Sequence, residues 1–278
     1  MDFSWFESLI TGIVTGLTEI LPVSSEAHSH ILLKFLGENS IPELTSLLSH
    51  IAILTAVVVA CHPHIMKMIR AKKLARIPKK KRKRPLDIRS LMDLSLLQTM
   101  LLPVILALLL YRKISEFTIN SVVIATFLFL NGLILYIPQF LPSSNKDCRS
   151  LSRVEGLLMG LGGALFVIPG FSGIGVAVSA ASVCGVDRKY GLNMILLMHI
   201  GVLFGRIILD IIALFSAGFA FFTLKLVLFS LLGALAAFTA AYLAIKLMRS
   251  LAQEKGYGFF SYYCWGLALF TFVLTLIA

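Results

Sequence analysis

Long apolar stretches recur along most of this 278-residue chain, and most approach the roughly 20 residues that a helix needs to cross a bilayer. The clearest cover residues 48–62, 91–111, 118–138, 190–214, 222–247 and 258–277. Hydrophobic residues make up 58% of the chain and charged residues 14%, whereas a soluble domain is about half apolar and about a quarter charged. We therefore expect an all-α integral membrane protein with several spans and exclude a soluble globular domain.

Two further apolar stretches are interrupted by residues that end helices. Residues 8–36 are broken at Leu21–Ser25, and residues 154–186 at Pro169–Gly173. Because proline and glycine stop a helix, each stretch predicts two helices that are too short to span the bilayer separately. Irregular backbone at membrane depth must be buried inside protein, so we expect two re-entrant helix pairs.

The two halves of the chain repeat a pattern. Leu47–Ile51 and Leu196–Ile200 share the sequence Leu-Leu-x-His-Ile, and each follows one of the broken pairs. Each half holds one re-entrant pair and an odd number of spans, so the second half must enter the membrane inverted. We therefore expect an inverted repeat of residues 1–140 and residues 141–278.

The basic residues are concentrated in one segment. Twelve of the 25 Lys and Arg residues fall between Lys67 and Arg89. The positive-inside rule predicts that loop 62–90 is cytoplasmic, so that both termini face outward. Topology and contact with anionic lipid account for the net charge of +11, and we expect no nucleic-acid partner.

Ionisable side chains are rare in the apolar stretches and indicate function, because each costs at least about 2.5 kcal/mol near the bilayer midplane. They are Glu19, Glu26, His28, His30, His50, His199, Arg206 and Asp210. The group from Glu19 to His30 also contains Ser24 and Ser25 and surrounds the first break. Backbone N–H groups freed at a break, and the start of the following helix, can bind an anion.

The second break offers small residues for a ligand. Gly170 and Gly173 flank Ser172, and glycine lets a ligand approach the backbone closely. A phosphate-bearing lipid head group fits two such breaks, because helix ends bind the anion, hydroxyls orient it and a carboxylate holds a cation or a proton.

The segment Gly16–His28 resembles the first signature of the bacterial undecaprenyl-diphosphate phosphatase family, the bacitracin-resistance membrane phosphatases. The likeness covers essentially the whole chain and includes His50–Val57, Leu165–Ser172 and Gly233–Arg249. This resemblance implies a homodimer in the bacterial inner (cytoplasmic) membrane, with an outward-opening site and a divalent cation, Mg²⁺ or Ca²⁺. It also implies that a polyprenyl diphosphate lipid, undecaprenyl diphosphate, is hydrolysed to the monophosphate that carries cell-wall precursors.

The resemblance also implies roles for individual residues. Glu19, Ser25 and His28 are expected to be catalytic, with Glu19 as the ligand of the cation. Together with the two breaks, the repeated histidines and the other ionisable residues of the apolar stretches, the resemblance leads us to expect phosphate binding by Ser24, Glu26, Gly170, Ser172, Gly173, His50, His199 and Arg206.

The chain departs from the family pattern at the reaction centre. Thr15 stands where the first of two acids belongs, and Gly163 replaces the usual glutamine. Gly173 and Ile174 replace the arginine and the second serine of the motif Pro-Gly-x-Ser-Arg-Ser-Gly. Glycine cannot replace a guanidinium that binds phosphate through two hydrogen bonds. We therefore expect weak phosphatase activity that restoring these residues would raise.

Two functions stay open at this point. The first is a phosphatase in which Ser25 or His28 acts on the terminal phosphate, while Arg206 or a bound cation replaces the missing arginine. The second is a transporter or flippase that keeps the pocket and carries a lipid phosphate between leaflets. For single residues, helix capping, histidine packing and an Arg206–Asp210 pair within one helix are the plainer interpretations.

Overall fold

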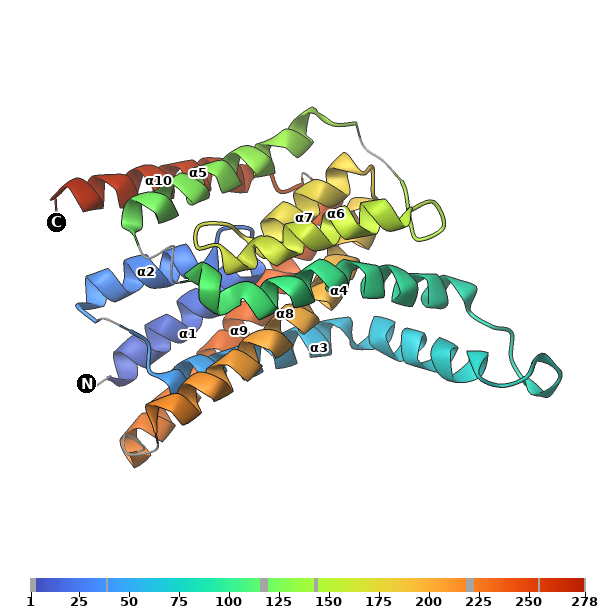
Figure 1. Ribbon diagram of the computed structural model, residues 1–278, viewed down its shortest axis with the longest axis horizontal. Helices are drawn as coiled ribbons and strands as arrows, with labels where there is room; N and C mark the ends of the chain where they lie inside the picture. The colour runs from blue at the N-terminus through green and yellow to red at the C-terminus, as the bar shows by residue number, and fades with distance from the viewer. Residues whose placement is uncertain are drawn as a thin grey trace.

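The computed structural model describes residues 4–38, 40–115, 120–142, 145–218, 223–254 and 256–277, and these residues form helices without a β-strand. The α-helices are α1 (Trp5–Ile20), α2 (Ser25–Leu36), α3 (Glu43–Ala75), α4 (Ile88–Ser115), α5 (Ser121–Tyr136), α6 (Arg153–Ala164), α7 (Gly173–Val183), α8 (Arg188–Ala217), α9 (Leu224–Glu254) and α10 (Phe259–Ile277). They pack side by side into one elongated bundle (Figure 1).

Among the described residues, 6 helices are long and apolar enough to cross a membrane. They are α3, α4, α5 with the short 3-10 turn that extends it to Phe140, α8, α9 and α10. Each of the predicted spans falls on one of them, although residues 118, 119 and 222 lie outside the described residues. Large apolar side chains such as Leu109 and Leu235 are exposed on their outer faces, as a lipid environment requires. The prediction of an all-α, multi-pass membrane protein is confirmed.

The four remaining helices form two pairs, and each pair is separated at a predicted break. Helix α2 begins after Ser24, whose side chain accepts a hydrogen bond from the Ala27 N–H. Helix α7 begins after Ser172, whose side chain accepts one from the Gly175 N–H. Serine caps helices in this way because its oxygen satisfies a backbone donor that the first turn leaves free. Both predicted helix breaks are therefore present.

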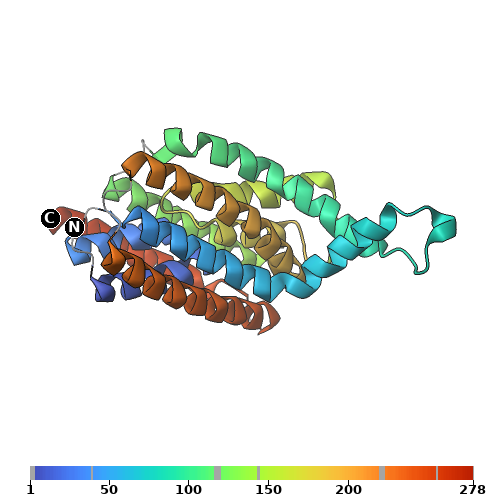
Figure 2. The ribbon, with the colours of Figure 1, turned by 90° about the horizontal axis from the view of Figure 1, so that it is seen from below.

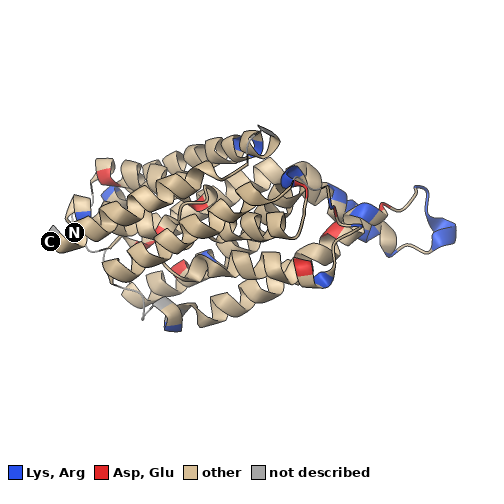
Figure 3. Cartoon of the chain, turned by 90° about the horizontal axis from the view of Figure 1, so that it is seen from above, with Lys and Arg blue, Asp and Glu red and all other residues tan. Residues whose placement is uncertain are grey.

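The basic segment is more helical than the sequence suggested. Helix α3 continues through Pro63 to Ala75, and α4 begins at Ile88, so the predicted loop 62–90 is reduced to residues 76–87. Long Lys and Arg side chains favour helix and can stay in water, which explains why the apolar pattern ends before the helix does. The resulting hairpin projects from the bundle, at the end opposite both termini (Figure 2), and Lys and Arg residues are concentrated on it (Figure 3).

Small residues let two extensive contacts between helices form at close range. Helix α1 packs along α9, and a Cβ atom added at Gly12 would overlap the carbonyl of Gly233. Gly160 on α6 lies in the same way against the backbone of Met100 on α4. In membranes, close packing of this kind supplies dispersion contacts where the hydrophobic effect gives no driving force.

We expect Gly12→Ala to destabilise the protein, because its methyl group must displace the α9 backbone. Overpacking of this kind costs about 1–3 kcal/mol, and thermal unfolding in detergent should show it as a lower midpoint. Gly266→Ala on α10 is the matched control, since a Cβ atom there meets nothing within 4 Å. An equal midpoint for both variants would contradict the packing argument.

Candidate functional site

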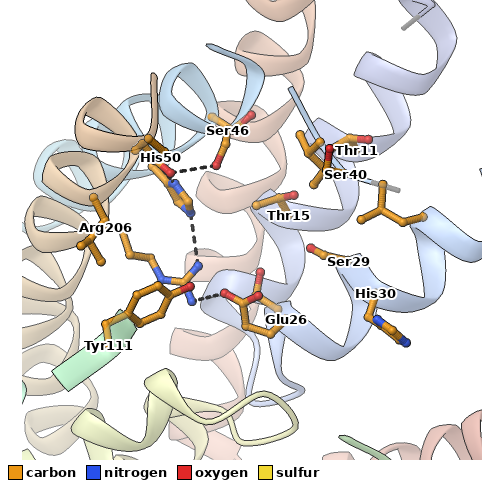
Figure 4. A pocket seen from close by; sticks show the side chains of 17 residues that line it. Thr11, Thr15, Glu26, Ser29, His30, Ser40, Ser46, His50, Tyr111 and Arg206 are labelled. Atoms are coloured by element: carbon orange, nitrogen blue, oxygen red, sulfur yellow. Dashed lines mark hydrogen bonds and ion pairs between the residues drawn. The ribbon is translucent and has the colours of Figure 1, made fainter. Parts of the chain in front are cut away.

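Buried charges gather around Arg206, where α8 faces the first break. The Arg206 Nη2 atom donates to Glu26 Oε1 at 2.5 Å, and Nη1 lies 3.8 Å from Glu19 Oε2. The Nη1 atom is also 3.3 Å from His50 Nε2 (Figure 4). One guanidinium therefore contacts α1, α2 and α3 together.

His50 links this guanidinium to a second acid. Its Nδ1 atom lies 2.6 Å from Asp210 Oδ2, and the other Asp210 oxygen accepts a hydrogen bond from Ser46 at 3.1 Å. A guanidinium only donates, so His50 Nε2 must accept from Arg206 and Nδ1 must carry the proton given to Asp210. This geometry fits a neutral imidazole. It also shows that Asp210 pairs with α3 rather than with Arg206 on its own helix.

Glu19 completes the cluster from the side of the second break. His199 Nε2 lies 3.4 Å from Glu19 Oε1, and both side chains are buried. The Arg206 Nε atom is also buried and has no hydrogen-bond partner among the described residues. The cluster thus contains one buried guanidinium N–H that none of the described residues accepts.

Two cavities meet at these residues. The larger has a volume of about 440 Å³, and its polar lining includes Thr15, Ser46 and His50. The smaller, of about 20 Å³, lies between Glu19, His199 and the start of α7 at Ser172 and Gly173. Both are lined by Ser25, Glu26 and Arg206. Of the predicted candidates around the first break, Ser25 and Glu26 are therefore brought together with Arg206 of α8.

The three polar residues of the first break face different ways. Ser24 is buried, caps α2 and accepts a hydrogen bond from the Gly170 N–H at 3.2 Å. Ser25 lines both cavities, and its hydroxyl has no hydrogen-bond partner among the described residues. His28 lines neither cavity, because its Nδ1 atom donates to the Ser24 carbonyl at 2.8 Å and its Nε2 atom accepts from the Tyr263 hydroxyl at 2.7 Å. Of these residues, Ser25 is the one placed to meet a ligand.

At the second break, the packing around Gly173 leaves little space for the arginine that the family motif has at this position. A Cβ atom at Gly173 would lie 2.6 Å from the Gly163 carbonyl oxygen, and one at Gly163 would overlap the side chain of Met198. The end of α6 and the start of α7 therefore pack directly against each other. The sequence-based expectation that Gly173→Arg would rebuild the site has to be revised, since the larger residue needs a backbone shift.

Sequence reasoning missed Asn131 and Tyr263. Asn131 is fully buried on α5 and hydrogen-bonds to both breaks: Nδ2 donates to the Pro22 carbonyl at 3.2 Å, and Oδ1 accepts from the Ser172 N–H at 2.9 Å. The signal in the sequence was the amide of Asn131 inside an apolar span. The rule that polar side chains within a membrane span indicate function, applied above to the ionisable residues, would have found it.

The divalent cation that the resemblance implies stays a prediction. Within the part of the chain that is described, no three His, Cys, Asp or Glu residues are grouped to hold a metal ion. Glu19, the expected ligand, already contacts Arg206 and His199. We therefore assign no step to a cation.

Comparison with known proteins gives one consistent answer. The family described as "Bacitracin resistance protein BacA" matches residues 8–270. A protein of Methanobrevibacter smithii named undecaprenyl-diphosphatase is 32% identical over 279 residues, covering 96% of both chains. Proteins of the same name from Carboxydothermus hydrogenoformans and Thermosipho melanesiensis are 27% and 28% identical, and each alignment covers 96% or more of both chains.

The charge cluster predicts a coupled effect on stability. Arg206→Met should lower the unfolding temperature strongly, because it leaves Glu19 buried without its cation; such losses reach about 3–5 kcal/mol. Adding Glu19→Gln should recover part of the loss, since the unpaired charge disappears. Thermal unfolding of the two single variants and the double variant measures this coupling. Strictly additive losses would show that the two groups do not interact.

Proposed function

Because this chain belongs to the bacitracin resistance protein BacA family, we propose that it is a membrane phosphatase that converts undecaprenyl diphosphate to undecaprenyl phosphate. The family match and the names of the relatives support this activity. The observation that carries it to this chain's own residues is the buried Arg206 guanidinium, which lies beside the unpaired Ser25 hydroxyl at the junction of two cavities.

In this proposal Arg206 takes the role of the missing arginine. It comes from α8 instead of α7, and its buried Nε–H has no acceptor among the described residues. Glu26, which occupies Nη2, has a side chain that is 30% exposed, so a phosphate oxygen can replace its carboxylate. A guanidinium binds phosphate through parallel hydrogen bonds and stabilises the charge of the transition state.

Ser25 is the proposed nucleophile. Its Oγ atom attacks the terminal phosphorus, the bond from that phosphorus to the bridging oxygen breaks, and undecaprenyl phosphate leaves. Water then cleaves the phosphoserine and releases inorganic phosphate. The carboxylate of Glu26 lines the same cavities and is the proposed acceptor of the serine proton. We assign His28 a positioning role, since it holds the Ser24 turn through the Ser24 carbonyl.

We also propose that residues 1–140 and 141–278 are inverted repeats, each starting with a re-entrant pair. Helices α1 and α6 both begin with a capping box, Ser4 with Glu7 and Ser152 with Glu155. The contacts also correspond: α1 packs along α9 as α6 packs along α4, and α3 packs against α8 as α5 packs against α10. These pairs are the ones that a two-fold axis in the membrane plane would relate.

The remaining features of the proposal concern the membrane. We place the protein in the bacterial inner (cytoplasmic) membrane with the basic hairpin in the cytoplasm, and we keep the homodimer as a prediction of the resemblance. The large cavity lies toward the end of the bundle that holds the termini, so it would open outward. The transport alternative finds no support in the comparisons.

The activity prediction compares variants of one residue. We expect purified protein to release phosphate from undecaprenyl diphosphate, more slowly than a relative with both family acids and the arginine. Arg206→Gln should lower kcat/KM by about 10²–10³-fold, the usual effect of removing a transition-state donor. Arg206→Lys should recover little, because an ammonium lacks the planar fork.

Ser25→Ala should abolish release, and Ser216→Ala on the outer part of α8 is its matched control. A folded Arg206→Gln or Ser25→Ala variant with unchanged turnover would refute the assigned roles. The same assay with Mg²⁺, Ca²⁺ or a chelator tests the cation that the resemblance implies.

The orientation is testable with single cysteines. Lys80→Cys at the hairpin tip should react with an impermeant thiol reagent only after cells are opened, whereas Ser40→Cys should react in intact cells. The native Cys61, Cys148 and Cys264 are buried and give little background. The reverse labelling pattern would mean that the hairpin faces outward.

A further inference from the structure

A second polar cavity lies at the other end of the bundle, where the basic hairpin leaves it. It has a volume of about 570 Å³ and lies between α3, α4, α8 and α9. On α3, its lining residue His64 is 14 residues beyond His50, which corresponds to about 20 Å at 1.5 Å per residue. The two cavities have no lining residue in common.

The acids of this cavity are already engaged by the scaffold. Asp187 caps α8 by accepting the Tyr190 N–H at 2.8 Å. The buried Asp93 accepts the Tyr190 hydroxyl at 2.8 Å and lies 3.1 Å from His64 Nε2. Asp87 accepts both the hydroxyl and the N–H of Ser90, and these bonds hold its pKa below the ordinary value.

Three of the cations in the lining form no ion pair in the described part of the chain, although the charge of Lys67 contributes to the lowered pKa of Asp87. Arg249 donates to the Ala60 carbonyl at 2.9 Å and lies 3.4 Å from Asn193 Oδ1, both neutral oxygens. The ammonium groups of Lys67 and Lys189 form no ion pair or hydrogen bond among the described residues. A fourth cation, Arg89, pairs with Asp147 at 3.3 Å. The lining as a whole carries four cations against the three acids Asp87, Asp93 and Asp187, so its formal charge is +1.

We propose that this cavity is a phosphate-binding site, and that its ligand is the head group of an anionic phospholipid. Phosphate oxygens match both the Arg249 fork and the two ammonium groups. The cavity lies where α3 and α4 change from apolar to basic sequence, the level at which lipid phosphates meet a spanning helix. Lipid bound there would join the base of the hairpin to α8 and α9. This inference does not rest on the proposed phosphatase activity.

The test uses the purified full chain in neutral detergent. Phosphatidylglycerol, phosphatidylcholine and inorganic phosphate are added separately, and binding is followed by native mass spectrometry and thermal unfolding. The double variant Lys67→Gln with Lys189→Gln removes two exposed ammonium groups and should fold. Its matched control, Lys79→Gln with Lys80→Gln, removes the same charge from the hairpin tip.

We expect the wild type to bind phosphatidylglycerol more tightly than phosphatidylcholine. The cavity variant should bind it about 10- to 30-fold more weakly, at about 1 kcal/mol for each basic residue, while the tip control changes little. Equal stabilisation by inorganic phosphate, lost in the same variant, would retain the phosphate site and assign it a soluble ligand. Equal weakening in both variants, or no preference over phosphatidylcholine, would overturn the proposal by showing general attraction or none.

Discussion

The amide of Asn131 holds the two helix breaks together, and the candidate site depends on this contact. A break at membrane depth frees backbone groups that no water satisfies, and each unpaired buried group costs about 1–3 kcal/mol. Here the polar groups of the two breaks are paired. Asn131 donates a hydrogen bond to the Pro22 carbonyl and accepts one from the Ser172 N–H. The Ser24 hydroxyl accepts one from the Gly170 N–H. The bonds that pair these groups also fix where α2 starts, and so where Ser25 and Glu26 point.

The charge cluster is a second consequence of the same arrangement. Because α2 starts beside α8, Glu26 reaches Arg206, and Glu19 at the end of α1 reaches it from the other side. Burying such a group of charges is weak evidence for stability, since an apolar core of the same shape is often as stable. A cluster that leaves one guanidinium N–H unpaired at a cavity therefore calls for a functional explanation.

The sequence predicted the features that depend on local patterns. It did not predict side-chain contacts between residues that are far apart in the chain. The spans and the breaks follow from apolar length and from Pro22 and Pro169, and both were confirmed. The direction of His28 was not predictable, because Tyr263 of α10, 235 residues away, takes its Nε2 atom. The partner of Asp210 was equally hidden, since spacing on α8 suggests Arg206 while α3 supplies His50. Asn131 was visible in the sequence, but its two partners on the breaks were not.

The departures from the family pattern make physical sense as a set. Gly173 lets the start of α7 meet the Gly163 carbonyl at the end of α6, which leaves no space there for a larger residue, while Gly163 itself lies against Met198 of α8. In the proposed site the cation comes from Arg206 on α8, and it needs a counter-charge near it when no phosphate is bound. Glu26 supplies that charge from the first turn of α2. It lines the same cavity as Thr15, the residue that stands where the family has its first acid. An arginine restored at Gly173 alone would crowd the α6 backbone and add a second cation to a cluster already paired. The proposed phosphate site therefore depends on the geometry of α8, and the motif on α7 contributes a helix start and a serine cap.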